Sequence, residues 1–266
     1  MAPVVGPRKS RNKVRHKPEI VVLPDPKALA TYLANWMLDR ALESEGPAAI
    51  ALSGGSTPAV LYPQLAEPAF ALRFPWTRIH WFWGDERFVP LDHPRSNFRL
   101  AWTTFLSRVP APRSNIHPIP VGENTAEAAA NAYESELQRF YGNNSLMPGR
   151  ELFHVNLLGL GENGHFASLF PGSAALGERK HWSAVTENDG ESRVTLTYPT
   201  LESSRHAVFL VVGDAKSTIL QRFVAGDASL PAARFSPDGG LHIFADSAAA
   251  AKVSTTAPNS RGTIVT

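Results

Sequence analysis

The chain has 266 residues and no cysteine, and its 26 lysine and arginine residues against 24 aspartate and glutamate residues give a formal net charge of +2. A chain of this length can bury a full core without a disulfide or a structural metal. The absence of cysteine excludes a disulfide scaffold, a cysteine-ligated zinc or iron–sulfur site and a thiol nucleophile.

The positive charge is concentrated at the N-terminus. Residues 1–18 contain six basic residues and no acidic residue, whereas the rest of the chain contains 20 basic and 24 acidic residues. Such a charge run usually stays solvated, so we predict a flexible basic extension over 1–18 and one domain over 19–266. The extension has no aromatic residues that could stack on bases, and we therefore expect no nucleic-acid partner.

Apolar stretches in this chain have the length of strands. The run at 207–212 falls far short of the roughly 20 residues that a membrane-spanning helix needs. The basic N-terminus is not followed by the apolar core of a signal peptide. We expect a cytoplasmic protein with no membrane partner, either a monomer or a small homo-oligomer.

Strand-like and helix-like segments alternate along the domain. In chain order, we predict a strand at 19–23, a helix from 25 up to 46, a strand at 48–52, a helix from 58, a strand at 79–83, a helix at 98–106, a strand at 116–119, a helix at 125–141 and a strand at 152–158. Strands at 194–198 and 207–212, a helix at 215–225, a strand at 241–244 and a helix at 247–253 follow. This order predicts an α/β domain with a mostly parallel sheet covered by helices on both faces.

Ligands of open parallel sheets bind beyond the carboxyl ends of the strands, so the loops after strands are the candidate sites. The first is Ser53-Gly54-Gly55-Ser56-Thr57-Pro58. Its glycines allow close backbone approach, Thr57 can cap the next helix, and the free amides at a helix start favour an anion such as phosphate. The loop lacks the lysine of a nucleotide P-loop, and an ordinary capped turn is the alternative.

The loop after the 79–83 strand carries three charges in Gly84-Asp85-Glu86-Arg87. Asp85 can orient a hydroxyl or a base, and Arg87 can bind a phosphate or carboxylate with two hydrogen bonds. The alternative is a surface ion pair of little energetic value. A second polar group at 96–99, which includes Asn97, follows closely and is predicted near the start of the next helix.

The loop after the 152–158 strand reads Gly159-Leu-Gly161-Glu-Asn-Gly164. This is a dinucleotide pattern, but Pro171 and Gly172 follow too soon for the long helix that such a site requires. His165 follows the loop directly, and a histidine there can activate water near neutral pH, although a lone histidine is more often structural. Lys216, after the 207–212 strand, either completes an anion site or is a solvated lysine.

Other hydrolytic chemistry finds no support in the sequence. No G-x-S-x-G serine elbow occurs, and the nine histidines show no metal-ligand spacing, so we predict no metal site.

Several of these stretches together resemble the 6-phosphogluconolactonase family, within the glucosamine-6-phosphate isomerase/6-phosphogluconolactonase superfamily. The matching stretches, in family order, are Leu52-Ser-Gly-Gly-Ser-Thr-Pro58, Trp83-Gly-Asp-Glu-Arg-Phe-Val-Pro90 with Asp92-His-Pro-Arg-Ser-Asn97, Leu157-Leu-Gly-Leu-Gly-Glu-Asn-Gly-His165 with Ala167-Ser-Leu-Phe-Pro-Gly172, Arg193-Val-Thr-Leu-Thr197, and more weakly Val211-Val-Gly-Asp-Ala-Lys216 and Leu230-Pro-Ala-Ala233.

The resemblance implies a Rossmann-like fold and hydrolysis of 6-phospho-D-glucono-1,5-lactone to 6-phosphogluconate in the pentose phosphate pathway, without metal or organic cofactor. His165 matches the catalytic histidine, which we expect to take a proton from water and return it to the ring oxygen. Asp85 would orient this histidine or a sugar hydroxyl. The predicted substrate-binding residues are Ser53, Gly54, Gly55, Ser56, Thr57, Arg87, Asn97, Gly161 and Lys216. Arg87 and Lys216 would hold the phosphate, and amides of Gly54, Gly55 or the 161–164 loop would stabilise the oxyanion.

This sequence departs from the family pattern at two positions. The family usually has Asp-Gly-His-Thr, where this chain has Asn163-Gly164-His165-Phe166. The deaminase branch of the superfamily resembles Asp-Gly-His-Ile-Ala-Phe-Asn-Glu, and its Asp and Glu are replaced here by Asn163 and Phe170. These changes disfavour a sugar-phosphate isomerase or deaminase. Two further competing hypotheses are a non-catalytic sugar-phosphate sensor and a dinucleotide enzyme.

Overall fold

The computed structural model describes residues 17–253 and 263–265. Nearly all of the basic extension predicted for 1–18 lies outside the described residues. Among the described residues, no helix combines the length and apolar character required to cross a bilayer.

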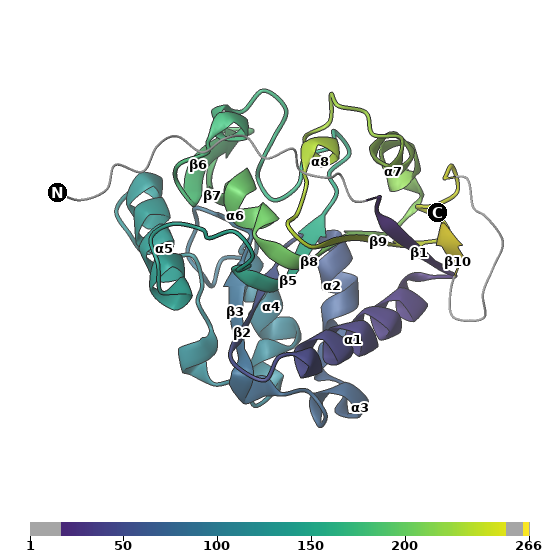
Figure 1. The fold of residues 1–266 in the computed structure, drawn as a ribbon, viewed down its shortest axis with the longest axis horizontal. Helices are drawn as coiled ribbons and strands as arrows, with labels where there is room; N and C mark the ends of the chain where they lie inside the picture. The colour runs from purple at the N-terminus through teal and green to yellow at the C-terminus, as the bar shows by residue number, and fades with distance from the viewer. Residues whose placement is uncertain (1–16, 254–262, 266) are drawn as a thin grey trace.

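A seven-stranded sheet forms the centre of the molecule (Figure 1). Its strands, in spatial order, are β10 (Thr263–Val265), β1 (Glu19–Leu23), β9 (Gly240–Asp246), β8 (Ser204–Val211), β5 (Phe153–Gly159), β2 (Ala48–Leu52) and β3 (Ile79–Trp83). All neighbours are parallel except β10, which runs antiparallel to β1. The predicted mostly parallel α/β sheet is therefore confirmed.

The central strands of the main sheet are largely buried. Every residue of β2 is buried, and β5 and β8 are almost as enclosed. Helices α1 (Pro26–Glu43) and α2 (Ser56–Leu61) lie on one side of the sheet, and α7 (Ser217–Val224) and α8 (Pro231–Arg234) lie on the other (Figure 1). The sheet is thus covered on both faces, which parallel strands require.

The remaining helices are short apart from one, and capping residues set their ends. They are α3 (Pro68–Ala71), α4 (Asn97–Thr104), α5 (Ala126–Tyr141) and α6 (Tyr198–Glu202). Thr125 caps α5 by accepting a hydrogen bond from the Ala128 N–H, and Gly142 ends it with a φ of 72°. Asp25 caps α1 in the same way through the Ala28 N–H, next to the residue where the sequence predicts that this helix begins.

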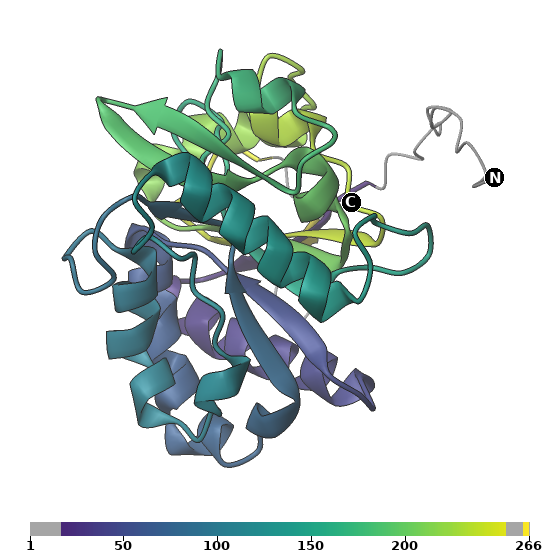
Figure 2. The ribbon, with the colours of Figure 1, turned by 90° about the vertical axis from the view of Figure 1, so that its left-hand side faces the viewer.

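A second, antiparallel sheet lies beside the main one, in the strand order β4 (Asp85–Arg87), β7 (Glu191–Leu196), β6 (Ser183–Asn188). The β6–β7 hairpin projects from the body of the molecule (Figure 2). Asp189 and Gly190 form its turn with φ of 52° and 73°, the left-handed pair typical of a two-residue hairpin. This sheet turns the charged loop after β3 into a strand, which the sequence did not predict.

Two predicted elements are wrong in type, and a third has the wrong bounds. Residues 116–119 form no strand, only one bridge from Ile116 to Trp81, because Pro118 and Pro120 lack the N–H groups that a ladder needs. Residues 247–253 form turns instead of a helix. The predicted 194–198 strand is present as β7, which spans Glu191–Leu196, but it ends two residues early because α6 begins at Tyr198, where Pro199 suits the first helical turn.

Candidate active site

A cavity of about 580 Å³ lies at the carboxyl ends of the parallel strands, where the loops after β2, β3, β5 and β8 meet. Each of the predicted site residues lines it: Ser53, Gly54, Gly55, Ser56, Thr57, Asp85, Arg87, Asn97, Gly161, His165 and Lys216. Arg193, Glu162, Asp189 and Phe170 line the same cavity without having been assigned a site role from the sequence.

The loop after β2 is fixed by two close contacts. The Tyr62 hydroxyl donates to the Ser53 carbonyl at 2.8 Å and accepts from the Ser53 N–H at 3.0 Å. A Cβ atom on Gly54 would lie 1.7 Å from Asn97 Oδ1, so only glycine fits there. The helix begins at Ser56 with Gly55, at a φ of 100°, in the N-cap position. The predicted cap by Thr57 is therefore wrong, since Thr57 lies inside the first turn.

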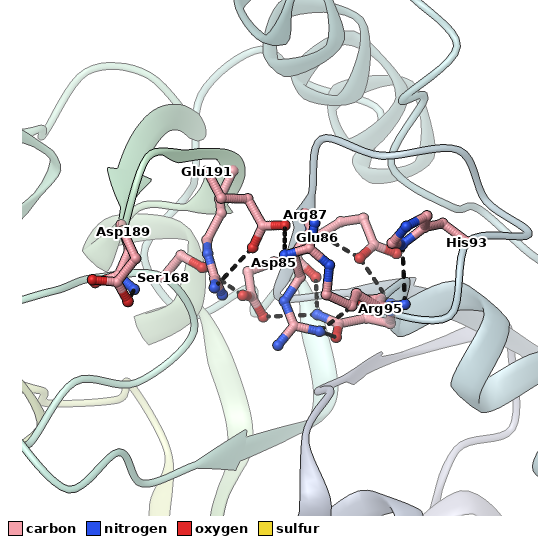
Figure 3. Close-up of polar contacts among 11 residues, drawn as sticks. Asp85, Glu86, Arg87, His93, Arg95, Ser168, Asp189 and Glu191 are labelled. Carbon is pink, nitrogen blue, oxygen red and sulfur yellow. Dashed lines mark hydrogen bonds and ion pairs between the residues drawn. The ribbon is translucent and has the colours of Figure 1, made fainter.

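Successive side chains of the strand β4 point to opposite faces of its sheet, so neighbouring charged side chains lie on opposite sides (Figure 3). Asp85 and Arg87 line the cavity, whereas Glu86 is buried behind them with 1% exposure. The Glu86 carboxylate accepts hydrogen bonds from the N–H groups of Asn97 and Phe98, both at 2.8 Å. Burial raises the pKa of Glu86, and these hydrogen bonds oppose that rise. Glu86 thus anchors the start of α4 to β4.

Arg87 is held by neutral oxygens. Its Nη1 donates to the Arg95 carbonyl at 2.7 Å and to Asn97 Oδ1 at 2.9 Å. Arg87 therefore does not form the surface ion pair that was the alternative interpretation of this loop. Instead, Arg87 lies opposite Arg193 in the β4–β7 ladder, and both arginines line the cavity. Burial and the positive charge of Arg87 lower the pKa of Arg193. An anion in the cavity would relieve this repulsion.

The imidazole of His165 is held in one tautomer. Its Nδ1 lies 2.6 Å from Asn163 Oδ1, and the same oxygen accepts the backbone N–H of His165 at 3.2 Å. Because a backbone N–H can only donate, the Asn163 atom is an acceptor, and Nδ1 must carry the proton. No described residue hydrogen-bonds to Nε2. Its lone pair is therefore free on a residue that lines the cavity.

Charge and burial around His165 keep the imidazole neutral. Burial is the main cause that lowers its pKa, and the positive charges of Lys216 and Arg193 lower it further. The Asp85 carboxylate acts in the opposite direction. A neutral imidazole at pH 7 is the form that can accept a proton.

The glycine loop leaves room for this ring. A Cβ on Gly161 would lie 2.1 Å from the His165 ring, and Gly164 has a φ of 80°. The Gly161 N–H donates to the His165 carbonyl at 2.8 Å, and the Gly164 N–H donates to the Gly161 carbonyl at 2.9 Å. Turns and bends follow, with no α-helix before β6, so the dinucleotide pattern has no helix to open.

The two departures from the family pattern have different consequences. Asn163 keeps a hydrogen bond to Nδ1 without contributing a charge. Phe166 is fully buried, with its ring against Tyr198, Phe209 and Phe235. Phe166 therefore contributes to the core and not to the cavity.

Lys216 ends a single 3₁₀ turn, Asp214–Lys216, after β8, and its Nζ lies 3.9 Å from Glu162 Oε1. That ion pair is long, and the Glu162 side chain is 73% exposed, so Lys216 remains available to an incoming anion.

In the described part of the chain, no group of histidine, aspartate and glutamate side chains is arranged to hold a metal ion.

Comparison with known proteins gives a consistent result. Residues 24–244 match the family described as glucosamine-6-phosphate isomerases/6-phosphogluconolactonase. The 6-phosphogluconolactonase of a Nostoc species is 40% identical over 90% of this chain and 99% of its own.

Solved structures agree. The 6-phosphogluconolactonase of Thermotoga maritima is 30% identical with a TM-score of 0.73, covering 85% of this chain and 98% of its own. That of Trypanosoma cruzi is 29% identical with a TM-score of 0.77, covering 92% and 100%. On the motifs, the fold and these matches, the chain belongs to the glucosamine-6-phosphate isomerase/6-phosphogluconolactonase family.

Proposed function

We propose that this protein hydrolyses 6-phospho-D-glucono-1,5-lactone to 6-phosphogluconate, with His165 as the general base. The observation that carries the proposal is the geometry of His165, whose protonated Nδ1 is bound to Asn163 and whose Nε2 is free in the cavity. The relatives named 6-phosphogluconolactonase support the substrate.

The reaction needs one proton acceptor that later becomes a donor. Nε2 of His165 takes a proton from water as the water oxygen attacks the lactone carbonyl carbon. The bond from that carbon to the ring oxygen then breaks, and the protonated imidazole returns the proton to this oxygen. The products are a hydroxyl group and a carboxylic acid, which ionises in water. Histidine is thus regenerated without any covalent intermediate.

Positioning groups surround the base. Arg87, Arg193 and Lys216 supply positive charge for the phosphate, so binding energy from a remote group holds the lactone in place. Backbone N–H groups of Gly54 and Gly55 are the better candidates for the oxyanion. In the 161–164 loop, the other source of donors expected from the sequence, the amides of Gly161 and Gly164 are already hydrogen-bonded within the turn.

The rival functions predict other results. An isomerase or deaminase would release ammonia from glucosamine 6-phosphate, but Asn163 and Phe170 stand where that branch has acidic residues. A non-catalytic sensor would bind 6-phosphogluconate without turnover. A dinucleotide enzyme would be stabilised against melting by a nicotinamide cofactor.

The decisive experiment is an assay with freshly generated lactone, from which the rate of spontaneous ring opening is subtracted. His165→Ala should lower kcat by at least about 100-fold while binding of 6-phosphogluconate is largely kept, because losing a general base costs rate more than affinity. Near-normal turnover by this variant would show that another group is the base. The cytoplasmic location, the absence of nucleic-acid partners and the oligomeric state stay predictions.

A further inference from the structure

The Asp85 carboxylate has one short side-chain hydrogen bond among the described residues. Ser168 Oγ donates to Asp85 Oδ2 at 2.6 Å, and Figure 3 shows the two side chains together. The amide of Asn97 lies 3.4 Å from Oδ1, a weaker contact, since its 2.9 Å bond goes to the Asp85 main-chain oxygen. Asp85 is 6% exposed, so little water is available to replace the Ser168 hydroxyl.

Ser168 comes from the same turn as His165. The Leu169 N–H donates to the Phe166 carbonyl at 3.0 Å, which closes a tight turn after the histidine. Inside this turn, Ala167 has a φ of 46°, a left-handed conformation that a residue with a Cβ adopts only under constraint. The Ser168 N–H is bonded to Thr195 Oγ1 at 3.2 Å, and Thr195 pairs with Asp85 in the β4–β7 ladder.

Ser168 itself is fully buried and does not line the cavity. It cannot touch a substrate there. Its hydroxyl nevertheless joins the turn that carries the base to the strand that carries the carboxylate. A rigid link of this kind fixes two groups of a site relative to each other, and small displacements in a site reduce rate strongly.

We propose that Ser168 is a positioning residue that fixes the Asp85 carboxylate relative to His165. The proposal rests on the proposed function, because it assigns Asp85 a part in turnover. It differs from a simple packing role in one respect: the effect of Ser168 must pass through Asp85.

The first test compares Ser168→Ala with Ser204→Ala. Ser204 is also fully buried, and its hydroxyl donates at 2.6 Å to the Leu201 carbonyl, at the start of β8. Both variants lose one buried hydrogen bond, so their melting temperatures should fall similarly. We expect kcat to fall about tenfold in Ser168→Ala only, the scale of one hydrogen bond to a charged group, with KM little changed. Equal kcat values in the two variants would overturn the proposal.

The second test is a double-mutant cycle with Asp85→Ala. If Ser168 acts through Asp85, Ser168→Ala should lower kcat no further once Asp85 is gone, whereas Ser204→Ala should leave kcat unchanged in both backgrounds. An equal loss from Ser168→Ala in both backgrounds would mean a structural role.

If the unmodified protein has no lactonase activity, or His165→Ala keeps it, the proposed function fails. If those two results hold and Ser168→Ala equals wild type, only this inference fails.

Discussion

Cavities of nearly equal volume lie at the two ends of the main sheet, about 580 Å³ at the carboxyl end and about 590 Å³ at the amino end. Both contain arginine and histidine side chains. At the amino end, Nε2 of His154 is bonded to the Arg40 carbonyl at 2.7 Å, and Nδ1 of His80 lies 2.9 Å from Nε2 of His117. At the carboxyl end, Nδ1 of His165 is bonded to Asn163, and the ring lines the same cavity as Asp85, Arg193 and Lys216.

The difference lies in which part of the chain builds each cavity. The amino-end cavity is lined by strand starts, the segment before β2 and residues 140–141 and 149–151, and its histidines His80 and His154 are hydrogen-bonded within the fold. The carboxyl-end cavity is made of glycine-containing loops that leave polar atoms and amides unoccupied. A lowered histidine pKa occurs at both ends, for His165 and His154, and burial is the main cause in each case. A shifted pKa alone therefore does not identify a site. His165 differs in the charged groups that share its cavity, namely Asp85, Arg87, Arg193 and Lys216.

The largest effect should come from a glycine at the carboxyl end. Gly161→Ala would place a Cβ 2.1 Å from the His165 ring, so the imidazole must move. We expect kcat to fall by about 100-fold, because a displacement of about 1 Å in a site can have that effect.

The matched control is Gly46→Ala at the other end of the sheet. A Cβ on Gly46 meets nothing within 4 Å, so lactone turnover should be unchanged. Wild-type turnover by a folded Gly161→Ala variant would mean that the ring position seen here is not needed for rate.

The sequence predicted the strands and the position of the site because both depend on local patterns. β1, β2 and β3 begin and end at the predicted residues, since each is a short, mainly apolar run. The candidate residues follow strands, and the carboxyl ends of parallel strands meet at one edge.

Contacts between distant segments could not be predicted in this way. The strand β6, with the sequence SAVTEN, has too few apolar residues to read as a strand. Without the second sheet, nothing placed Arg193 opposite Arg87 or Ser168 against Asp85. The close approach of Gly54 to Asn97 is hidden for the same reason, because it is a property of packing and not of either segment alone.

The next largest effect is expected on the pH dependence of the free energy of unfolding, through His206 at the amino end of the main sheet. Burial, with a smaller contribution from the neighbouring His242, lowers the pKa of His206 to about 3. Below pH 6.5 the unfolded chain binds a proton at this residue, while the folded chain does not until about pH 3. The stability that depends on neutral His206 is therefore complete above pH 6.5 and decreases as the pH falls, by at most about 1.4 kcal/mol per pH unit.

His206→Phe should make the free energy of unfolding less dependent on pH between 6.5 and 5, measured by urea denaturation. The control is His181→Phe, whose side chain is 62% exposed and meets water in the folded and unfolded chains alike. Parallel curves for His206→Phe and wild type would contradict burial of a neutral imidazole.

The smallest expected effect is a shift in the pH dependence of turnover when Asn163, the neutral hydrogen-bond partner of His165, is changed. In Asn163→Asp, a carboxylate would replace the amide oxygen beside Nδ1, and its charge would favour the imidazolium form. This raises the pKa of His165, against the effect of burial. Because only neutral His165 can take a proton from water, the acid limb of the kcat/KM profile should move to higher pH. Asn188→Asp adds the same charge to the same cavity at a residue whose side chain is hydrogen-bonded to Asp189 and not to the imidazole, and it should move the limb less. Equal movement in both variants would mean that charge in the cavity, and not the Asn163 hydrogen bond, sets the proton affinity of the base.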